Sequence, residues 1–370
     1  MATILIWMSP EPGHILPTVK VARDLQNAGH RVVYQVPRSQ NDDILELGFD
    51  AIPFFDQLLT SYQIRLFEPS HPADCLFDTL SKTFSGNAYA RAFRRELAKA
   101  VHSIRADLLI VDGIYHDVLG LQMEVSLKPH CRVARMYTHL PYKFMRGEYS
   151  GPGVTSIFLA PRDFELSQFI IKDSHYTEGT VFSDKDREFP WDLIANNRVI
   201  IYCSFGSQIE EYPEAEDNLR EIIAMTATIE DCQVIINAGL LRDRLAGLST
   251  EKALIFARVP QAAILKIASA MILHGGFGTI KDCIIHEVPM LVLPHKWDQH
   301  LNAFRVGRHE LGVSLSSAQR NSSTIAHTLS HLLSNQIYRA KLSEMHRIFA
   351  QREDEQPTRR LLERVLTSKR

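Results

Sequence analysis

The residues that most strongly suggest chemistry form the glycine-rich stretch His274-Gly275-Gly276-Phe277-Gly278-Thr279, directly after the apolar run Met271–Leu273. An apolar run, a glycine-rich turn and a polar segment together predict a strand, a loop and the start of a helix. In that arrangement the glycines let a ligand approach the backbone, and the helix start offers unpaired N–H groups and the positive end of the helix dipole. The stretch therefore predicts an anion site, with phosphate as the first candidate. Its spacing fits neither G-x-x-x-x-G-K-[ST] nor G-x-G-x-x-G, which argues against a P-loop and the common dinucleotide fingerprint.

A second pair of residues suggests proton transfer. His14 lies in a loop rich in proline and glycine after the first apolar run, and Asp112 ends the apolar run 108–111. A neutral imidazole is suited to remove a proton from a hydroxyl, and a carboxylate can hold its other nitrogen and stabilise the imidazolium. Taken singly, His14 could be a helix cap and Asp112 a strand-end turn residue. Together, opposite an anion loop, they favour a catalytic pair.

Alternating strands and helices must position these residues. Apolar runs without polar alternation are typical of parallel strands that are covered on both faces. They occur at 4–8, 31–36, 108–111 and 132–137, and again at 199–203, 233–237, 253–256, 271–273 and 290–293. Segments with helical periodicity separate them, among them 15–28, 87–105, 214–229 and 299–308. Two successive runs of this kind predict an α/β protein with two Rossmann-like parallel-sheet domains.

We divide the chain into a first domain over 1–182, a linker over 183–198 and a second domain over 199–345. Residues 346–370 are expected to form a C-terminal helix that packs back on the first domain. The linker is placed by the polar, turn-rich segment Ser183–Pro190. Open parallel sheets bind ligands at the carboxyl ends of their strands, where all the polar loops above lie, so the sequence predicts one site in a cleft between two domains.

The second half resembles the nucleotide-sugar domain of the family 1 glycosyltransferases, which have the GT-B fold. The matching motifs span roughly 45 residues: Val259-Pro260-Gln261, His274-Gly275-Gly276-x-Gly278-Thr279, Val288–Pro294 and Asp298-Gln299-x-x-Asn302-Ala303. The first half resembles the same family in Gly13-His14-x-x-Pro17 and in Asp112. This family includes plant UDP-glycosyltransferases and bacterial macrolide- and antibiotic-type enzymes. The segments 38–105 and 140–190 carry little of the resemblance.

The resemblance implies a role for each motif residue. The nucleotide-sugar-binding residues would be Ser204, Gly206, Ser207, Arg258, Val259, Gln261, His274, Gly276, Gly278, Thr279 and Asp282. Among them His274 would contact the α-phosphate. Asp298 and Gln299 would hold sugar hydroxyls. The ordinary alternatives are a helix N-cap for the Asp298-Gln299 pair, a helix cap for Gln261, and a cap or core histidine for His274.

Three positions depart from the family pattern. Asp282 replaces the usual Glu that bonds the ribose hydroxyls, and it could instead compensate the helix dipole. Arg258 replaces a Trp that stacks on uracil; a guanidinium can also stack on a base, or it could be a solvent-facing charge. Glu287 replaces a Gly, and if that position needs a positive φ it costs about 1–2 kcal/mol.

The resemblance implies an inverting glycosyltransferase that needs no metal or other cofactor. His14 and Asp112 would be the catalytic residues of a single in-line displacement. The donor would be a UDP-sugar or dTDP-sugar, and the acceptor a hydroxyl on a small, largely apolar molecule such as a natural-product aglycone. Aromatic-bearing segments that could line the acceptor site are Phe54-Phe55, Phe67, Phe84, Tyr89, Met136-Tyr137 and Tyr142–Phe144. Two alternatives stay open: a UDP-sugar epimerase with the same fold, and a non-catalytic nucleotide-sugar-binding or helper protein.

Composition excludes several other classes. A formal net charge of −2 argues against a generic nucleic-acid binder. The chain has neither a basic signal-peptide start nor an apolar run of the roughly 20 residues that would span a bilayer. Its five scattered cysteines form no C-x-x-C pair, which is typical of reduced thiols in the cytoplasm. Asp184-x-Asp186 and His286-Glu287 both lack the context of a metal site. We expect a monomer or homodimer.

Overall fold

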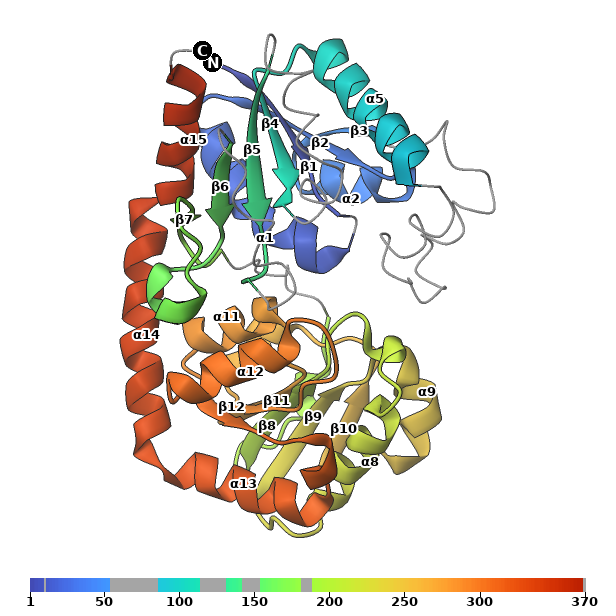
Figure 1. The fold of residues 1–370 in the computed structure, drawn as a ribbon. Helices are drawn as coiled ribbons and strands as arrows, with labels where there is room; N and C mark the ends of the chain where they lie inside the picture. Colours follow the sequence, from blue (N-terminus) through green and yellow to red (C-terminus); the bar gives the residue numbers. More distant parts are fainter. Residues whose placement is uncertain (10, 54–85, 114–130, 142–153, 181–187, 369–370) are drawn as a thin grey trace. The chain divides into compact units, whose positions relative to one another are not determined.

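The computed structural model describes residues 1–9, 11–53, 86–113, 131–141, 154–180 and 188–368, with the side chains of 86–93 excepted. The chain divides into two compact units. Unit 1 contains Met1–Arg162, Ile170–Phe182 and Glu355–Arg370, and unit 2 contains Asp163–Phe169 and Ser183–Asp354. Both are parallel-sheet units with helices (Figure 1), so the α/β prediction is confirmed.

The sheet of unit 1 has the strand order β3-β2-β1-β4-β5-β6-β7, and all its strand pairs are parallel. The strands are β1 (Thr3–Trp7), β2 (Arg31–Val36), β3 (Asp50–Pro53), β4 (Leu108–Asp112), β5 (Arg132–Tyr137), β6 (Thr155–Phe158) and β7 (His175–Tyr176). In β1 the consecutive residues Ile4, Leu5 and Ile6 are all completely buried, which requires cover on both faces of the sheet. Because Trp7 pairs with Val111, the loops that follow β1 and β4 leave the sheet side by side.

The helices of unit 1 include one from the C-terminal end of the chain. They are α1 (Pro12–Asn27), α2 (Asn41–Glu46), α5 (Gly86–Ile104) and α15 (Pro357–Thr367). Leu361 and Leu362 of α15 belong to the same apolar core as Ile4 and Ile6. Figure 1 shows α15, in red, along one side of this sheet. At its start, the backbone N–H and hydroxyl of Thr358 both donate to the buried Glu178 carboxylate, at 3.0 and 2.7 Å.

The sheet of unit 2 has the strand order β10-β9-β8-β11-β12-β13 and is also parallel throughout. Its strands are β8 (Val199–Ser204), β9 (Cys232–Asn237), β10 (Ala253–Phe256), β11 (Ala270–Leu273), β12 (Met290–Val292) and β13 (Gly312–Ser314). The order reverses direction between β8 and β11, where Ser204 pairs with Leu273. Such a reversal is where open parallel sheets bind ligands.

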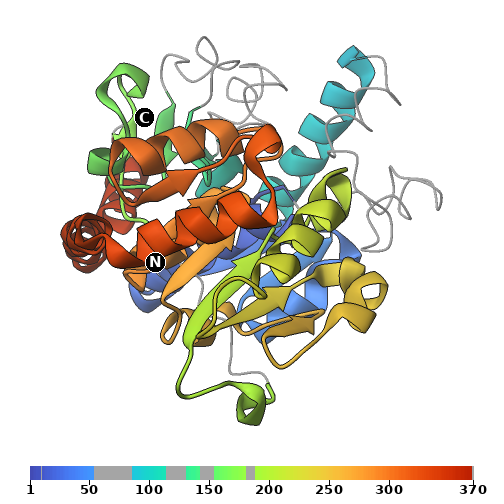
Figure 2. The ribbon, with the colours of Figure 1, turned by 90° about the horizontal axis from the view of Figure 1, so that it is seen from below.

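Helices lie on both faces of this second sheet (Figures 1 and 2). The described α-helices of this unit are α8 (Ala215–Met225), α9 (Arg242–Leu245), α10 (Gln261–Leu265), α11 (Phe277–Ile285), α12 (Gln299–Arg308), α13 (Ser322–Ser334) and most of α14 (Gln336–Glu355). Apolar residues of α8 and α13 share one core with the strand residues Ile201, Ile236 and Ile272. Tyr202 and Ile235, which alternate with these along their strands, are also fully buried, so the opposite face is covered as well.

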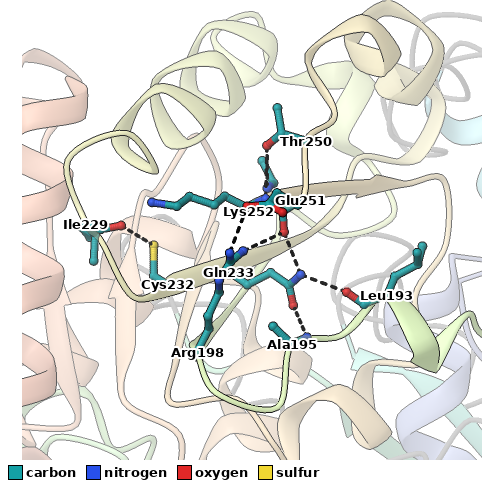
Figure 3. A network of polar contacts seen from close by, with 10 residues as sticks. Leu193, Ala195, Arg198, Ile229, Cys232, Gln233, Thr250, Glu251 and Lys252 are labelled. Carbon is teal, nitrogen blue, oxygen red and sulfur yellow. Dashed lines mark hydrogen bonds and ion pairs between the residues drawn. The ribbon is translucent and has the colours of Figure 1, made fainter.

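Residues 188–198, which are the described part of the predicted linker, are hydrogen-bonded to other parts of unit 2. Gln233 lies in β9 and is 2% exposed. Its side chain accepts from the Ala195 N–H (2.9 Å) and donates to the carbonyls of Leu193 (3.0 Å) and Glu251 (2.8 Å), as Figure 3 shows. Arg198 also bonds the Glu251 carboxylate at 3.0 Å. A single buried amide therefore fixes this segment before β8 to the loop before β10.

The segment Asp163–Phe169 also belongs to unit 2, although the division of the sequence at residue 182 placed it in the first domain. Phe164 is fully buried and its ring contacts the rings of Phe277 and Phe349. Glu165 forms a buried ion pair with Arg305 of α12. These contacts are made by residues more than 100 positions apart, which is why local sequence patterns did not predict them.

Candidate active site

The imidazole of His274 lies between two glycines at the carboxyl ends of β8 and β11. A Cβ atom on Gly206 would come within 2.8 Å of the ring, and one on Gly276 within 2.3 Å. Gly206 also has φ +80°, so any other residue there would strain the backbone. The sequence pattern His-Gly-Gly after a strand is thus explained by close packing of the backbone on the ring.

The His274 side chain is buried with an available ring nitrogen. It is 8% exposed, and its Nδ1 has no hydrogen-bond partner among the residues that the structure describes. Burial, together with the nearby His295, lowers the pKa of His274 to about 4. The ring is therefore neutral at neutral pH and brings no charge into the site, and it also makes a hydrogen bond with the backbone of Ser204.

The start of α11 next to His274 offers uncapped backbone N–H groups. Gly276 is the N-cap residue, and within the described chain no side chain caps this helix. The first turn carries no acidic residue. Gly278 is exposed and Thr279 half-buried, so this end is open to a ligand. An uncapped helix start without a carboxylate is suited to bind an anion.

Ser204 and Ser207 lie on the loop that faces this helix start. Ser204 ends β8 and is buried, and its hydroxyl accepts a long hydrogen bond from the Gly206 N–H at 3.4 Å. Ser207 is exposed. The structure therefore brings Ser204, Gly206, His274 and Gly276 together, with Ser207 at the solvent side.

Gln261 and Asp282 form a second polar pair, between α10 and α11. The Gln261 amide donates to the Asp282 carboxylate at 2.5 Å, and the Tyr202 hydroxyl donates to the Gln261 carbonyl oxygen at 3.4 Å. Burial raises the pKa of Asp282 to about 7. Asp282 is outside the first turn of α11, so it does not compensate the helix dipole there. Gln261 makes no cap hydrogen bond either; its amide binds Asp282 instead.

Asp298 is the N-cap residue of α12 and Gln299 is its first residue, and the two side chains have different surroundings. Gln299 is 2% exposed: its oxygen accepts from the N–H groups of His295 (2.8 Å) and Lys296 (3.0 Å), and its nitrogen donates to the Tyr212 hydroxyl (2.9 Å). Asp298 is half-buried and accepts from Asn302 at 2.8 Å, and its side chain makes no cap hydrogen bond. Gln299 thus holds the loop together, while Asp298 is the more accessible of the two.

His14 and Asp112 are hydrogen-bonded in unit 1. His14 Nδ1 lies 2.7 Å from Asp112 Oδ2, which also accepts from the Ser9 N–H at 3.2 Å. Burial alone would raise the pKa of Asp112, but the charge and hydrogen bond of His14, with smaller effects of His139 and the Ser9 N–H, hold it below its usual value. The carboxylate is therefore ionised at neutral pH. When the ring is neutral, this carboxylate fixes the proton on Nδ1, and Nε2 is then the basic nitrogen.

Known proteins that are similar to this chain are glycosyltransferases. Residues 221–358 match the C-terminal domain of the erythromycin biosynthesis protein CIII-like family. The chain is 20% identical to the UDP-glucosyltransferase YojK of Bacillus subtilis, covering 93% of each chain. It is 22% identical to the demethyllactenocin mycarosyltransferase of Streptomyces fradiae, covering 93% of this chain and 82% of the relative. These matches indicate that the chain is a glycosyltransferase, and that it is similar to the family 1 enzymes.

Solved structures confirm the GT-B fold of this glycosyltransferase. The glycosyltransferase of kitacinnamycin superposes with a TM-score of 0.78 at 19% identity, covering 99% of both chains. The spinosyn rhamnosyltransferase SpnG, solved with thymidine diphosphate, gives a TM-score of 0.74 at 16% identity, covering 98% of this chain and 100% of that one.

The residues that depart from the family pattern differ in backbone conformation and in exposure in this glycosyltransferase. Glu287 has φ +55°, so the positive φ that a Gly would favour is indeed required there. Arg258 is exposed and Val259 is buried beside it. Arg258 borders an open pocket of about 590 Å³ at the end of β10, whose lining also includes Leu193, Arg242 and Phe256.

One polar residue near the His14–Asp112 pair was missed by sequence reasoning. His139 follows β5, the strand beside β4, and its ring centroid lies 6.2 Å from that of His14 and 5.8 Å from that of Tyr137. Its position directly after a strand of the same sheet was the available signal. Of the aromatic segments expected to line the acceptor site, Met136 and Tyr137 are fully buried in unit 1. The others, at 54–55, 67, 84 and 142–144 together with the Tyr89 side chain, lie outside the described residues.

No group of three or more His, Cys, Asp or Glu side chains suited to a metal occurs in the described part of the chain. Asp184 and Asp186 lie outside it. The four cysteines that the structure describes, Cys131, Cys203, Cys232 and Cys283, are buried. None of the helices in the described ranges is both long enough and apolar enough to cross a lipid bilayer.

Proposed function

We propose that this glycosyltransferase moves a sugar from a UDP-sugar or dTDP-sugar to a hydroxyl of a small, largely apolar acceptor, with inversion and without a metal. The observation that carries the proposal is the 2.7 Å hydrogen bond between His14 and the ionised Asp112. It leaves Nε2 of a half-buried imidazole as a base, which a hydroxyl acceptor requires.

The proposed reaction is one displacement. The acceptor hydroxyl gives its proton to His14 Nε2 while its oxygen forms a bond to the anomeric carbon of the sugar. The bond from that carbon to the diphosphate oxygen breaks, and the diphosphate leaves with the electron pair. Asp112 stabilises the imidazolium that results. Because a single displacement proceeds from the face opposite the leaving group, the configuration at the anomeric carbon inverts.

The start of α11 supports the donor assignment. Uncapped N–H groups at Gly276–Thr279 and the neutral His274 could stabilise the charge that develops on the departing diphosphate, which is the role that metal ions have in other enzymes. The related SpnG has been solved with thymidine diphosphate, which supports a nucleoside diphosphate as ligand. In this proposal Gln261 and Asp282, which bond each other, bind the nucleoside, and Asp298 binds the sugar. Reduced cysteines favour action in the cytoplasm.

The test is a mass-spectrometric screen of UDP-sugars and dTDP-sugars against a panel of hydroxylated polyketide, terpenoid and phenolic acceptors. Each reaction is run with and without EDTA. We expect a product heavier than the acceptor by one sugar residue, with the same yield in both conditions. Rearranged donor sugar in the absence of any acceptor would indicate an epimerase instead, and loss of product in EDTA would contradict the metal-free mechanism.

A further inference from the structure

A buried ion pair outside the proposed ligand contacts joins a distant segment to α12. Arg305 Nε donates to Glu165 Oε1 and Nη2 donates to Oε2, both at 2.9 Å, and both side chains are completely buried. Glu165 lies between two short 3-10 turns (Arg162–Phe164 and Ser167–Phe169), and the Phe169 ring covers the guanidinium at 5.6 Å. A buried ion pair is weak evidence for stability, because desolvation offsets much of the attraction. The pair also positions a third side chain, that of Asn302.

The guanidinium of Arg305 sets the orientation of the Asn302 amide. Its third nitrogen, Nη1, donates to Asn302 Oδ1 at 3.0 Å. Since a guanidinium can only donate, the oxygen of the amide must face Arg305 and the nitrogen must face away. Asn302 Nδ2 donates in the opposite direction, to the Gly275 carbonyl at 3.0 Å and to Asp298 Oδ2 at 2.8 Å. Asn302 is completely buried, so solvent does not compete for these bonds.

The bond to the Gly275 carbonyl fixes the direction of a backbone N–H. The peptide unit between Gly275 and Gly276 is planar and trans, so its carbonyl and its N–H point in opposite directions. Gly275 has φ +93° and would otherwise have wide conformational freedom. By holding the carbonyl, Asn302 determines where the Gly276 N–H points at the start of α11. The same amide holds the Asp298 carboxylate.

We propose that Glu165 and Arg305 are positioning residues for the donor site. Through the orientation of Asn302 they hold the Gly276 N–H at the diphosphate end and the Asp298 carboxylate at the sugar end. This inference rests on the proposed function for the identity of the ligand. The relay Glu165–Arg305–Asn302 itself is made entirely of contacts within unit 2.

The first variant is Arg305→Lys, which keeps the charge next to Glu165 but loses the forked geometry that reaches Asn302. The second is Glu165→Gln, which keeps the shape and removes the charge. The matched control is His309→Phe. His309 Nε2 bonds the Phe164 carbonyl at 2.9 Å and its ring stacks on Phe164, so this change loosens the same 163–169 segment without touching the relay.

The direct readout is a single backbone resonance. The chain contains one Gly-Gly dipeptide, Gly275-Gly276. The protein is made with glycine that carries 13C at its carbonyl and 15N at its amide. Gly276 is then the one residue whose labelled amide follows a labelled carbonyl. A spectrum that selects such amides therefore shows the Gly276 N–H alone. We expect this resonance to shift or broaden in Arg305→Lys and, less strongly, in Glu165→Gln, and to stay in place in His309→Phe.

Calorimetric titration with UDP and dTDP, followed by donor kinetics, completes the test. In Arg305→Lys we expect about tenfold weaker nucleotide affinity, a raised KM for the donor, a lowered kcat and an unchanged KM for the acceptor. The inference is overturned if the Gly276 resonance does not move in either relay variant, or if His309→Phe moves it as much. If the unaltered protein binds neither UDP nor dTDP, the proposed function fails, and the resonance alone then decides on the relay.

Discussion

Asp112 determines which nitrogen of His14 carries the proton, and an amide at the same place would reverse that choice. In Asp112→Asn the side chain keeps its size, but its N–H can donate to His14 Nδ1. The neutral ring then carries its proton on Nε2, where it cannot accept one from a hydroxyl. In the proposed mechanism kcat falls about 10²–10⁴-fold, by analogy with the same Asp-to-Asn change in the catalytic triad of serine proteases.

The control for Asp112→Asn is nucleotide binding. The residues proposed to bind the nucleotide lie in unit 2, whereas Asp112 lies in unit 1, so calorimetric affinity for UDP or dTDP should be unchanged. Steady-state kinetics with a saturating acceptor give kcat. Full turnover by this variant would exclude the pair as the catalytic base.

Asp282 gives a prediction about pH and stability. Its pKa is raised to about 7 by burial, so the folded protein retains a proton that the unfolded chain releases near its ordinary value of 3.8. The stability that this carboxyl contributes is complete below that lower value and is lost as the pH rises through about 7. In Asp282→Asn the group is neutral throughout, so the variant should gain stability relative to the unaltered protein as the pH rises from 5 to 8.

Thermal unfolding at pH 5 and pH 8, without nucleotide, measures this difference. Asp217→Asn in α8 replaces an exposed carboxylate and serves as the control, with no such trend expected. A difference between Asp282→Asn and the unaltered protein that stays constant over this range would mean that Asp282 is not held protonated by burial.

At the scale of elements, the site of unit 2 depends on how closely the loop after β8 packs on the strand–loop–helix unit of β11 and α11. Gly206→Ala tests this packing, because its Cβ would meet the His274 ring at 2.8 Å and the backbone has φ +80°. Either the ring or the loop after β8 must shift, which changes the position of His274 at the start of α11. We expect about tenfold weaker binding of UDP or dTDP, which corresponds to about 1.4 kcal/mol.

Gly307→Ala is the matched control for that substitution. Gly307 lies in α12 with open space around its missing Cβ, and alanine there should stabilise the helix by about 0.5–1 kcal/mol. Titration calorimetry and thermal unfolding of both variants separate a change in binding from a change in stability. Equal nucleotide affinity in Gly206→Ala and the unaltered protein would show that the position of His274 is not critical.

The strands and part of the site could be predicted from the sequence. Continuous apolar runs predicted the parallel strands, and the rule that ligands bind at their carboxyl ends placed His274 beside Ser204 and His14 beside Asp112. These contacts follow from strand order and local pattern. The relay from Glu165 to Asn302 could not be predicted, since its partners are 140 residues apart and meet only through tertiary packing. The loop-holding role of Gln299 was also hidden, because a glutamine that binds backbone and one that binds sugar look alike in a sequence.

At the scale of the whole molecule, each of the two units has a large apolar core of its own, and α15 packs on the core of unit 1. Leu361 and Leu362 of α15 lie in the core of unit 1, whereas α13, earlier in the chain, contributes to the core of unit 2.

Leu362→Ala removes a completely buried side chain and should lower the free energy of unfolding by about 2–5 kcal/mol. Because the cores are distinct, the loss should fall on unit 1. Hydrogen exchange would then show faster exchange in β1, β4 and α15 and unchanged protection in β8 and β11. Leu366→Ala, at a partly buried position on the same core, should have a smaller effect. Equal loss of protection in both sheets would mean that the two units unfold as one, and nucleotide affinity would then fall together with the stability of α15.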